Sequence, residues 1–135
     1  ITMSALVMNN ALRLVLAATL LVCAAQAAQA PDDKMMDAIK NNKVQIFSKS
    51  YCPFCKKTKQ LFANLDVDFH VDELDQMEDG AAVQQELMKL SGQRTVPNVF
   101  IGGKHVGGND DCQRAFQDGK LSVLLKEAGV KHKEL

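Results

Sequence analysis

The sequence carries no excess charge of either sign. Lysine and arginine together number 16, aspartate and glutamate also number 16, and the formal net charge is zero. Nucleic-acid-binding proteins need an excess of positive charge, so this balance argues against a nucleic-acid partner and leaves room only for a local basic patch that selects a small anion. Repeats and low-complexity tracts are missing as well. The 135 residues, 47% of them apolar, predict one domain with its own core.

A second pair of metal ligands is also lacking. A structural zinc site normally takes two pairs of Cys or His ligands. Cys52 and Cys55 form one such pair, but Cys23 and Cys112 are far from them in sequence. The histidines supply no second pair at ligand spacing; they are His70, His105 and His132. The sequence therefore predicts no metal site.

Long apolar runs are confined to the N-terminal segment. Between Ala11 and Ala30 the chain has one charged residue, Arg13, followed by the run LVLAATLLVCAAQAAQA. One basic residue, a short apolar stretch and small residues at alternate positions are typical of a secretory signal peptide. The run is short for a membrane span, which needs about 20 residues. A membrane anchor and an organelle-targeting peptide are the alternatives.

Small residues in this segment offer two cleavage sites, after Ala27 and after Ala30. Cleavage after Ala30 would leave Pro31 at the new N-terminus, which disfavours it. We therefore expect residues 1–27 to be a cleaved signal peptide and residues 31–135 to form the domain, without a stable membrane span after cleavage. The expected location is the secretory lumen or the extracellular space; an organelle or the cytoplasm is the alternative.

Apolar periodicity and turn residues predict a regular alternation of helices and strands after residue 30. Helices are predicted at 31–41, 53–65, 76–90 and in a final region with Ala115, Phe116, Leu121, Leu124 and Leu125 on its inner face; strands are predicted at 44–47, 67–71, 97–101 and 104–106. Two strands joined through a helix are parallel, and the Gly102-Gly103 turn makes the last two antiparallel. The predicted fold is α/β, with a small mixed sheet flanked by helices.

The pair Cys52 and Cys55 lies where the first strand leads into a helix. A disulfide that encloses two residues restrains the unfolded chain very little, so a purely structural bridge explains the pair poorly. Pro53 suits the first turn of a helix, which puts Cys52 at the helix N-terminus beside unpaired N–H groups. Nearby positive charge comes from Lys49, Lys56 and Lys57.

This setting favours the thiolate form of Cys52, which is the attacking species in thiol chemistry. Cys55 lies one helical turn further on. We expect it to be more buried, to have a pKa near its ordinary value, and to attack a mixed disulfide formed on Cys52. Cys112 is expected to be a buried helical cysteine.

Three motifs in order, YCPFC at 51–55, TVP at 95–97 and GGNDD at 107–111, resemble those of a dithiol glutaredoxin. The stretch SGQRTVPNVFIGGKHVGGNDD is similar to the plant and algal class, and the likeness covers about residues 34–129. Phe54 departs from the usual CPYC motif, because it replaces the commoner tyrosine. The resemblance implies a thioredoxin-like fold with a four-stranded mixed sheet. It also implies a glutathione-dependent thiol–disulfide oxidoreductase that reduces protein–glutathione mixed disulfides and protein disulfides.

The resemblance further implies a binding site for glutathione as co-substrate, with no tightly bound cofactor. Its predicted residues are Lys49, Tyr51, Phe54, Gln93, Arg94, Thr95, Val96, Pro97, Gly108, Asn109 and Asp110. Lys49, Gln93 and Arg94 would hold carboxylates, the Val96 backbone beside a cis-proline would pair with the glutathione cysteine, and Asp110 would receive the γ-glutamyl amine. Taken alone, the charged residues read as solvated surface groups, Asn109 and Asp110 as helix caps, and Asp111 as a solvated charge.

Two other functions within the same fold class stay open. Some members of the family hold a [2Fe–2S] cluster between two protomers through the first cysteine and bound glutathione, but Pro53 stiffens the turn after that cysteine. A thioredoxin or disulfide-isomerase role is disfavoured because those families carry tryptophan before the first cysteine, and this chain has no tryptophan. Glutathionylated or disulfide-containing proteins are the expected partners, and the protein is expected to be a monomer.

Overall fold

The computed structural model describes residues 29–134, and the predicted signal peptide at 1–27 lies outside them. The folded unit begins at Pro31. Its helices are α2 (Pro31–Asn41), α3 (Pro53–Asn64), α4 (Gly80–Ser91), α5 (Asn109–Gln117) and α6 (Lys120–Glu127), with a short 3-10 helix, η1, at Leu74–Gln76. Within residues 29–134, no helix combines the length and the apolar character that crossing a bilayer requires.

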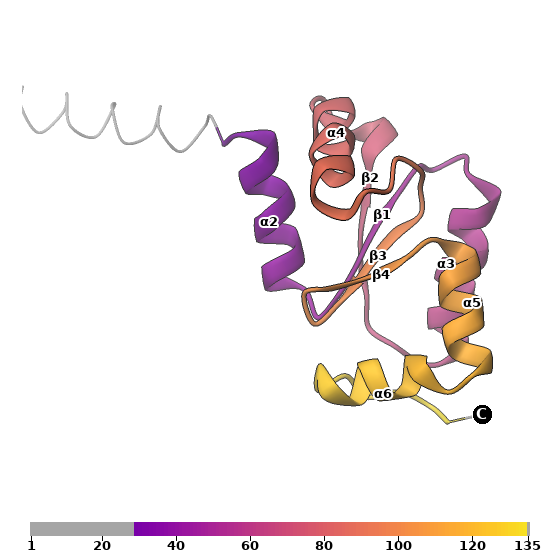
Figure 1. Ribbon diagram of the computed structural model, residues 1–135. Coiled ribbons are helices and arrows are strands. Elements are labelled where there is room, and N and C mark those ends of the chain that lie inside the picture. Colours follow the sequence, from indigo (N-terminus) through magenta and orange to yellow (C-terminus); the bar gives the residue numbers. More distant parts are fainter. Residues whose placement is uncertain (1–28, 135) are drawn as a thin grey trace, which may run out of the picture. The chain divides into compact units, whose positions relative to one another are not determined.

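A four-stranded sheet runs through the middle of the unit (Figure 1). Its strands are β1 (Val44–Ser48), β2 (His70–Glu73), β3 (Asn98–Ile101) and β4 (Lys104–Gly107), in the spatial order β2-β1-β3-β4. β1 and β2 are parallel, whereas β3 is antiparallel to both β1 and β4. The predicted α/β fold with a mixed four-stranded sheet is therefore confirmed.

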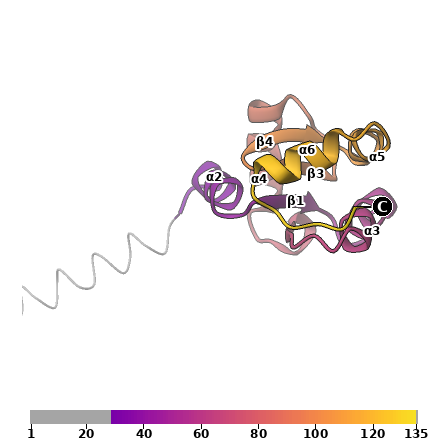
Figure 2. The same cartoon turned by 90° about the horizontal axis from the view of Figure 1, so that it is seen from below.

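Each face of the sheet is covered by its own set of helices, because successive strand residues point to opposite faces. On one face, α3, α5 and α6 pack on the sheet; the buried residues there are Val44, Ile46, Leu61, Phe62, Leu65, Val67, Val99, Ile101, Cys112, Ala115, Leu121 and Leu125. On the other face, α2, α4 and η1 bury Met35, Ile39, Phe47, Leu74, Val83, Leu87 and Phe100. The turned view separates α2 from α3 and α5 across β1 (Figure 2).

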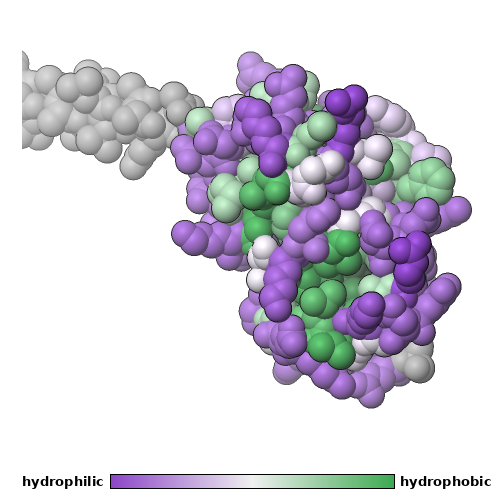
Figure 3. Space-filling model, viewed as in Figure 1, coloured by the Kyte–Doolittle hydropathy of each residue, from purple (hydrophilic) through white to green (hydrophobic). Residues whose placement is uncertain are grey.

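Hydrophilic residues cover most of the face drawn in Figure 3, and apolar residues show between them mainly near the middle of that face. β1 lies between the two apolar clusters. It starts at Val44, next to the contact of Lys43 with Gly129, and ends at Ser48 opposite Glu73, the residue before η1. The loop that carries Cys52 follows that second end.

Two predicted element boundaries are wrong. The second strand starts at His70 rather than at residue 67, because Asp66 takes a left-handed conformation with φ of 53° and the Val67 N–H donates to the Phe62 carbonyl. Val67 is buried at 5% exposure, so its apolar spacing reflects a turn packed on the core. The third predicted helix, α4, begins at Gly80 rather than 76, after η1. A Cβ on Gly80 would lie 1.8 Å from the Leu74 carbonyl oxygen, so the helix starts in contact with η1.

The final helical region also differs from the prediction, since it consists of two helices. α5 ends at Gln117 and α6 starts at Lys120, with Gly119 between them at φ of 82°. Glycine adopts this left-handed conformation without the steric cost that a Cβ brings. The break lets both Ala115 and Leu121 reach the same apolar cluster from helices of different direction.

Candidate active site

Cys52 lies where the chain leaves β1 and enters α3. It is the N-cap residue of α3, with Pro53 as the first residue of the helix. The Cys55 N–H donates to the Cys52 sulfur at 3.3 Å, and the sulfur lies 3.8 Å from the Val96 carbonyl oxygen. A hydrogen-bond donor and the positive end of the helix dipole therefore both face this sulfur. Cys52 is partly exposed and, like Cys55, is a free thiol.

Cys55 differs from Cys52 in its surroundings, because it has no exposed surface. Burial raises the pKa of the Cys55 thiol, and its hydrogen bond with Cys52 acts in the same direction; the Lys49 backbone and the Ser48 hydroxyl act against them. The prediction that Cys55 is the more buried cysteine is confirmed. The prediction that its pKa stays near the ordinary value is wrong, because burial outweighs the two groups that stabilise its thiolate.

Beside Cys52 lies an open cleft of about 430 Å³. It is lined by residues from the N-terminus of α3, the segment between α4 and β3, and the start of α5: Phe54, Gln93, Thr95, Val96, Pro97, Gly108, Asn109, Asp110 and Asp111. Folding thus brings together eight of the eleven residues predicted to bind a ligand. The Val96–Pro97 peptide bond is cis, as the resemblance to the family implied.

The other three predicted residues do not line this cleft. Arg94 turns toward α4, where its Nε lies 3.4 Å from the Met88 sulfur and its carbonyl accepts a hydrogen bond from Gln84. Tyr51 is 69% exposed on the loop before Cys52. Lys49 is half-buried at the start of that loop.

Gln93 has a role that the sequence did not predict. Its side-chain nitrogen donates to the Thr95 and Pro97 carbonyls, both at 2.9 Å. An amide NH₂ has two donor hydrogens, so both are engaged with the backbone on either side of Val96. Gln93 therefore braces the cis-proline segment that forms one wall of the cleft.

Asn109 and Asp111 make contacts at the start of α5 that the sequence did not predict. Asn109 is 9% exposed, and its side-chain oxygen accepts hydrogen bonds from Thr58 on α3 and Gln113 on α5. The N-cap of α5 is Gly108, whose N–H donates to the Asp111 carboxylate at 3.0 Å. Asn109 thus ties α3 to α5. Asp111 is an exposed charge in the first turn of α5, as expected, and its carboxylate also accepts a hydrogen bond at the helix start.

Cys112 is buried with no exposed surface, and burial raises the pKa of its thiol to about 12. This confirms the expectation of a buried helical cysteine. The thiol is kept apart from solvent on the α3, α5 and α6 side of the sheet.

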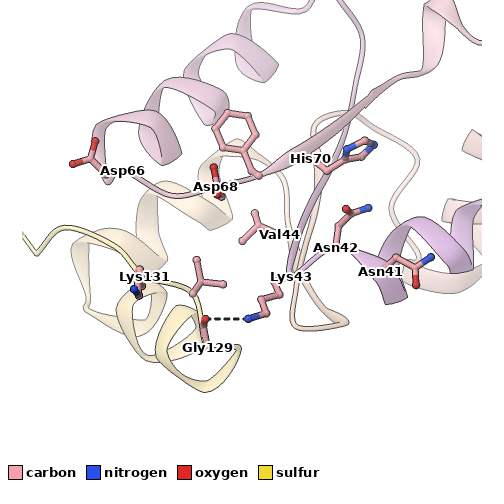
Figure 4. Close-up of a pocket in the computed structure, with 11 residues that line it drawn as sticks. Asn41, Asn42, Lys43, Val44, Asp66, Asp68, His70, Gly129 and Lys131 are labelled. Atoms are coloured by element: carbon pink, nitrogen blue, oxygen red, sulfur yellow. Dashed lines mark hydrogen bonds between the residues drawn. The ribbon is translucent and has the colours of Figure 1, made fainter.

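A second hollow of about 660 Å³ lies at the other end of β1 (Figure 4). Lys43 donates there to the Gly129 carbonyl at 3.2 Å, and Asp66, Asp68 and Lys131 stand around the opening. Its lining residues include no thiol. Of these two hollows, the cleft beside Cys52 is therefore the candidate site for a ligand that reacts with a thiol.

A partly exposed thiol at a helix N-terminus, with a second thiol buried behind it and a cis-proline beside it, is an arrangement suited to thiol–disulfide exchange. On a mixed four-stranded sheet, this arrangement defines an oxidoreductase of the thioredoxin-like class.

Comparisons with known proteins narrow the class. The glutaredoxin family model matches residues 44–106. Glutaredoxin-C4 from Arabidopsis thaliana is 46% identical over 123 residues, which cover 90% of this chain and 91% of that protein. A glutaredoxin from Vernicia fordii is 50% identical over 97 residues, 72% of this chain and 93% of that protein. The crystal structure of a buckwheat glutaredoxin–glutathione complex superposes with a TM-score of 0.72 at 45% identity, over 73% of this chain and 90% of that one.

The chain belongs to the glutaredoxin family and is a thiol–disulfide oxidoreductase.

Proposed function

We propose that this protein uses glutathione to reduce protein–glutathione mixed disulfides, and protein disulfides through Cys52 and Cys55. The observation that carries the proposal is the position of the Cys52 sulfur, 3.8 Å from the Val96 carbonyl at the wall of the 430 Å³ cleft. The similar buckwheat protein, whose structure is a glutathione complex, supports the choice of ligand.

The proposed reaction starts with attack of the Cys52 thiolate on the glutathione sulfur of a mixed disulfide. A Cys52–glutathione disulfide forms, and the protein thiolate leaves and takes up a proton. A second glutathione thiolate then attacks the glutathione sulfur on Cys52, which releases oxidised glutathione and restores Cys52. For a protein disulfide, Cys52 attacks one sulfur and Cys55 displaces the substrate, leaving a Cys52–Cys55 disulfide that two glutathiones reduce.

The ligand contacts proposed from the family fit the cleft unequally. The Val96 backbone and Asp110 line it, and they support the contacts to the cysteine and to the γ-glutamyl amine. The two donor hydrogens of Gln93 are already engaged, and Arg94 faces α4. Carboxylate binding by Lys49 and Arg94 would therefore require these side chains to turn toward the cleft when glutathione binds.

Two cysteine variants test the reaction. Cys52→Ser should abolish every activity, because it removes the attacking sulfur. Cys55→Ser should keep the reduction of a glutathionylated peptide and lose the reduction of a protein disulfide, since only the second reaction needs the buried thiol. The assay couples oxidised glutathione to glutathione reductase. Loss of peptide reduction in Cys55→Ser would contradict the monothiol step. An equal rate of free-peptide release with cysteine in place of glutathione, measured by chromatography, would contradict glutathione dependence.

The same preparations test the cluster-binding alternative. A brown colour and visible absorbance in anaerobically purified protein, lost in Cys52→Ser, would favour a glutathione-ligated [2Fe–2S] dimer over the monomeric catalyst. Pro53 in the first turn of α3 argues against that alternative, because it restricts the turn after the ligand cysteine.

We further propose that residues 1–27 direct the protein to the secretory pathway. The 123-residue similarity to Glutaredoxin-C4 reaches into the segment before residue 29, which supports a role for that segment. Glutaredoxin potentials lie about −200 to −230 mV, close to that of glutathione, so the compartment would set the direction of the reaction. A fluorescent fusion to residues 1–35 should enter the lumen and lose its first 27 residues; an organellar or cytoplasmic signal would contradict this.

A further inference from the structure

The loop at residues 49–51, between β1 and Cys52, is held from outside by one carboxylate. Asp75 of η1 accepts a hydrogen bond from the Ser50 N–H at 2.9 Å through one oxygen, and accepts another from the Ser50 hydroxyl through its second oxygen. Ser50 and Asp75 are 25 residues apart in sequence. Both of them are exposed, so this pair does not exist to fill the core.

The Ser50–Asp75 pair lies just beyond the paired ends of β1 and β2. The parallel ladder between β1 and β2 ends with Ser48 opposite Glu73. Two residues further along each chain, where both strands have ended, the Asp75 side chain accepts the Ser50 N–H. A side-chain contact therefore joins the two chain segments just beyond the end of the β1–β2 pairing.

The loop has one further restraint of its own. The Cys52 N–H donates to the Lys49 carbonyl at 3.0 Å, which closes a tight turn around Ser50 and Tyr51. The chain enters that turn from β1 and leaves it into α3, and the Asp75 side chain holds it from the side of η1. Movement of Ser50 would carry with it Lys49, the Tyr51 ring and the backbone that aims the Cys52 sulfur.

The Asp75 carboxylate is well suited to this task at neutral pH. The hydrogen bonds from the Ser50 hydroxyl and N–H lower its pKa from the ordinary 3.8, and the nearby Lys49 charge acts in the same direction. Because the pKa is lowered in the folded state, the contribution of this carboxylate is complete above the ordinary value. It is lost only as the pH falls through the lowered one.

We propose that Asp75 is a positioning residue for the thiol chemistry: through Ser50 it fixes the 49–51 loop, and thereby the direction of the Cys52 sulfur toward the cleft. Its catalytic consequence rests on the proposed glutathione reaction, whereas its effect on the sulfur itself does not.

Two substitutions at position 75 separate the effect of the Asp75–Ser50 hydrogen bonds from the effect of the Asp75 negative charge. Asp75→Asn and Asp75→Ala both remove the negative charge near Cys52. Asparagine keeps an oxygen that accepts the Ser50 N–H and an NH₂ that donates to the Ser50 hydroxyl, but alanine keeps neither. Any difference between the two variants therefore reports the hydrogen bonds. Glu78→Ala, at an exposed acidic residue three positions further on, is the control for charge at a distance.

Two readouts follow these variants: kcat/KM for a glutathionylated peptide, and the pH profile of Cys52 alkylation by iodoacetamide in a Cys55→Ser background. Asp75→Ala should lower kcat/KM roughly tenfold and move the alkylation profile away from that of Asp75→Asn, because small misplacements of reacting atoms cost one to two orders of magnitude. Asp75→Asn should stay within about threefold of wild type by the same reasoning. Equal behaviour of Asp75→Ala and Asp75→Asn in both readouts would overturn the proposal.

Ser50→Ala changes the same contact from the loop side. It removes the hydrogen bond from the Ser50 hydroxyl to Asp75 and keeps the one from the Ser50 N–H. Its effect should be smaller than that of Asp75→Ala, and the double variant should be no worse than Asp75→Ala alone, since both changes act on one contact. Fully additive effects would overturn the proposal. If the wild type proves not to depend on glutathione, the alkylation profiles still show whether Asp75 positions the Cys52 sulfur.

Discussion

At the scale of single residues, burial distinguishes the three cysteines of residues 29–134, whose thiols have the same chemistry. Cys52 is partly exposed at the N-terminus of α3, whereas Cys55 and Cys112 have no exposed surface. Cys55 lies one helical turn from Cys52, and the Cys55 N–H donates to the Cys52 sulfur. The two sulfurs are therefore placed to form a disulfide with each other. Cys112 belongs to the apolar cluster under α5. Position alone therefore suits one pair to disulfide exchange, whereas Cys112 contributes to the packing of the core.

The first prediction concerns Cys112. Because burial raises the pKa of its thiol to about 12, the thiol should stay uncharged and unlabelled by iodoacetamide at pH 8 in the folded protein, while Cys52 is labelled quickly. Guanidinium should expose it to labelling. Cys112→Ala should keep full activity and cost about 1 kcal/mol of stability, since it removes one buried sulfur. Mass spectrometry and urea denaturation measure these effects, and native labelling of Cys112 at the rate of Cys52 would contradict the prediction.

Residue roles were predictable where they depend on neighbours in sequence. The spacing of Cys52, Pro53 and Cys55 sets a helix N-terminus and a second thiol one turn away, and both are present. The role of Asp75 was not predictable, because its partner Ser50 is 25 residues away and meets it only after β1 and β2 have paired. Gln93 was assigned to a ligand carboxylate, and only the folded cis-proline segment shows that its donors are already engaged.

At the scale of elements, the start of α5 shows how backbone and side chain depend on each other. The Asp111 carboxylate accepts the Gly108 N–H at 3.0 Å. Gly107, just before, has φ of 126°, and a Cβ there would lie 2.2 Å from an Asp111 oxygen. The glycine is thus required both by its conformation and by the space that the capping carboxylate occupies. The GGNDD motif therefore has a structural reason besides its place in the cleft.

The second prediction follows from this cap. Asp111→Ala should lower the free energy of unfolding by about 1 kcal/mol, the usual effect of losing one capping hydrogen bond. Asp111→Asn is the matched control, because it keeps an oxygen that accepts the Gly108 N–H, and it should lose less. Gly107→Ala should lose more than Asp111→Ala, since it displaces the carboxylate and also strains the backbone. Urea denaturation ranks the three, and an equal loss for Asp111→Asn and Asp111→Ala would contradict the capping role.

Element order was predictable from periodicity, but two boundaries were not, and the reason is physical. Val67 alternates with Phe69 as a strand residue would, yet it is buried by a turn that follows the left-handed Asp66. Alternation reports which side chains face the core, and a packed turn produces it as well as a strand does. In the same way, η1 packs against the start of α4, so helical spacing began before the helix itself.

At the scale of the whole molecule, the two ends of β1 serve different purposes. Ser48 at one end leads to the loop with Cys52, while Lys43 just before the other end contacts Gly129 of the C-terminal segment. That segment contacts the end of α3 and helix α6: the Lys133 N–H donates to the Leu65 carbonyl at 2.7 Å, and His132 lies 2.9 Å from the Ser122 hydroxyl. The contacts of the C-terminal segment and the loop that carries Cys52 therefore lie at opposite ends of β1.

The third prediction tests this separation by ending the chain at Ala128. The shortened protein loses the Lys133 and His132 hydrogen bonds and the packing of Val130 against the core, so it should be less stable by about 2 kcal/mol. Its kcat at a temperature well below unfolding should equal that of the full chain, because the Cys52 loop lies beyond the far end of β1. His132→Ala, which removes one of these contacts, should show a smaller loss of stability and the same kcat. Unchanged stability in the shortened chain, or a reduced kcat while the protein is still fully folded, would mean that the two ends of the strand are not independent.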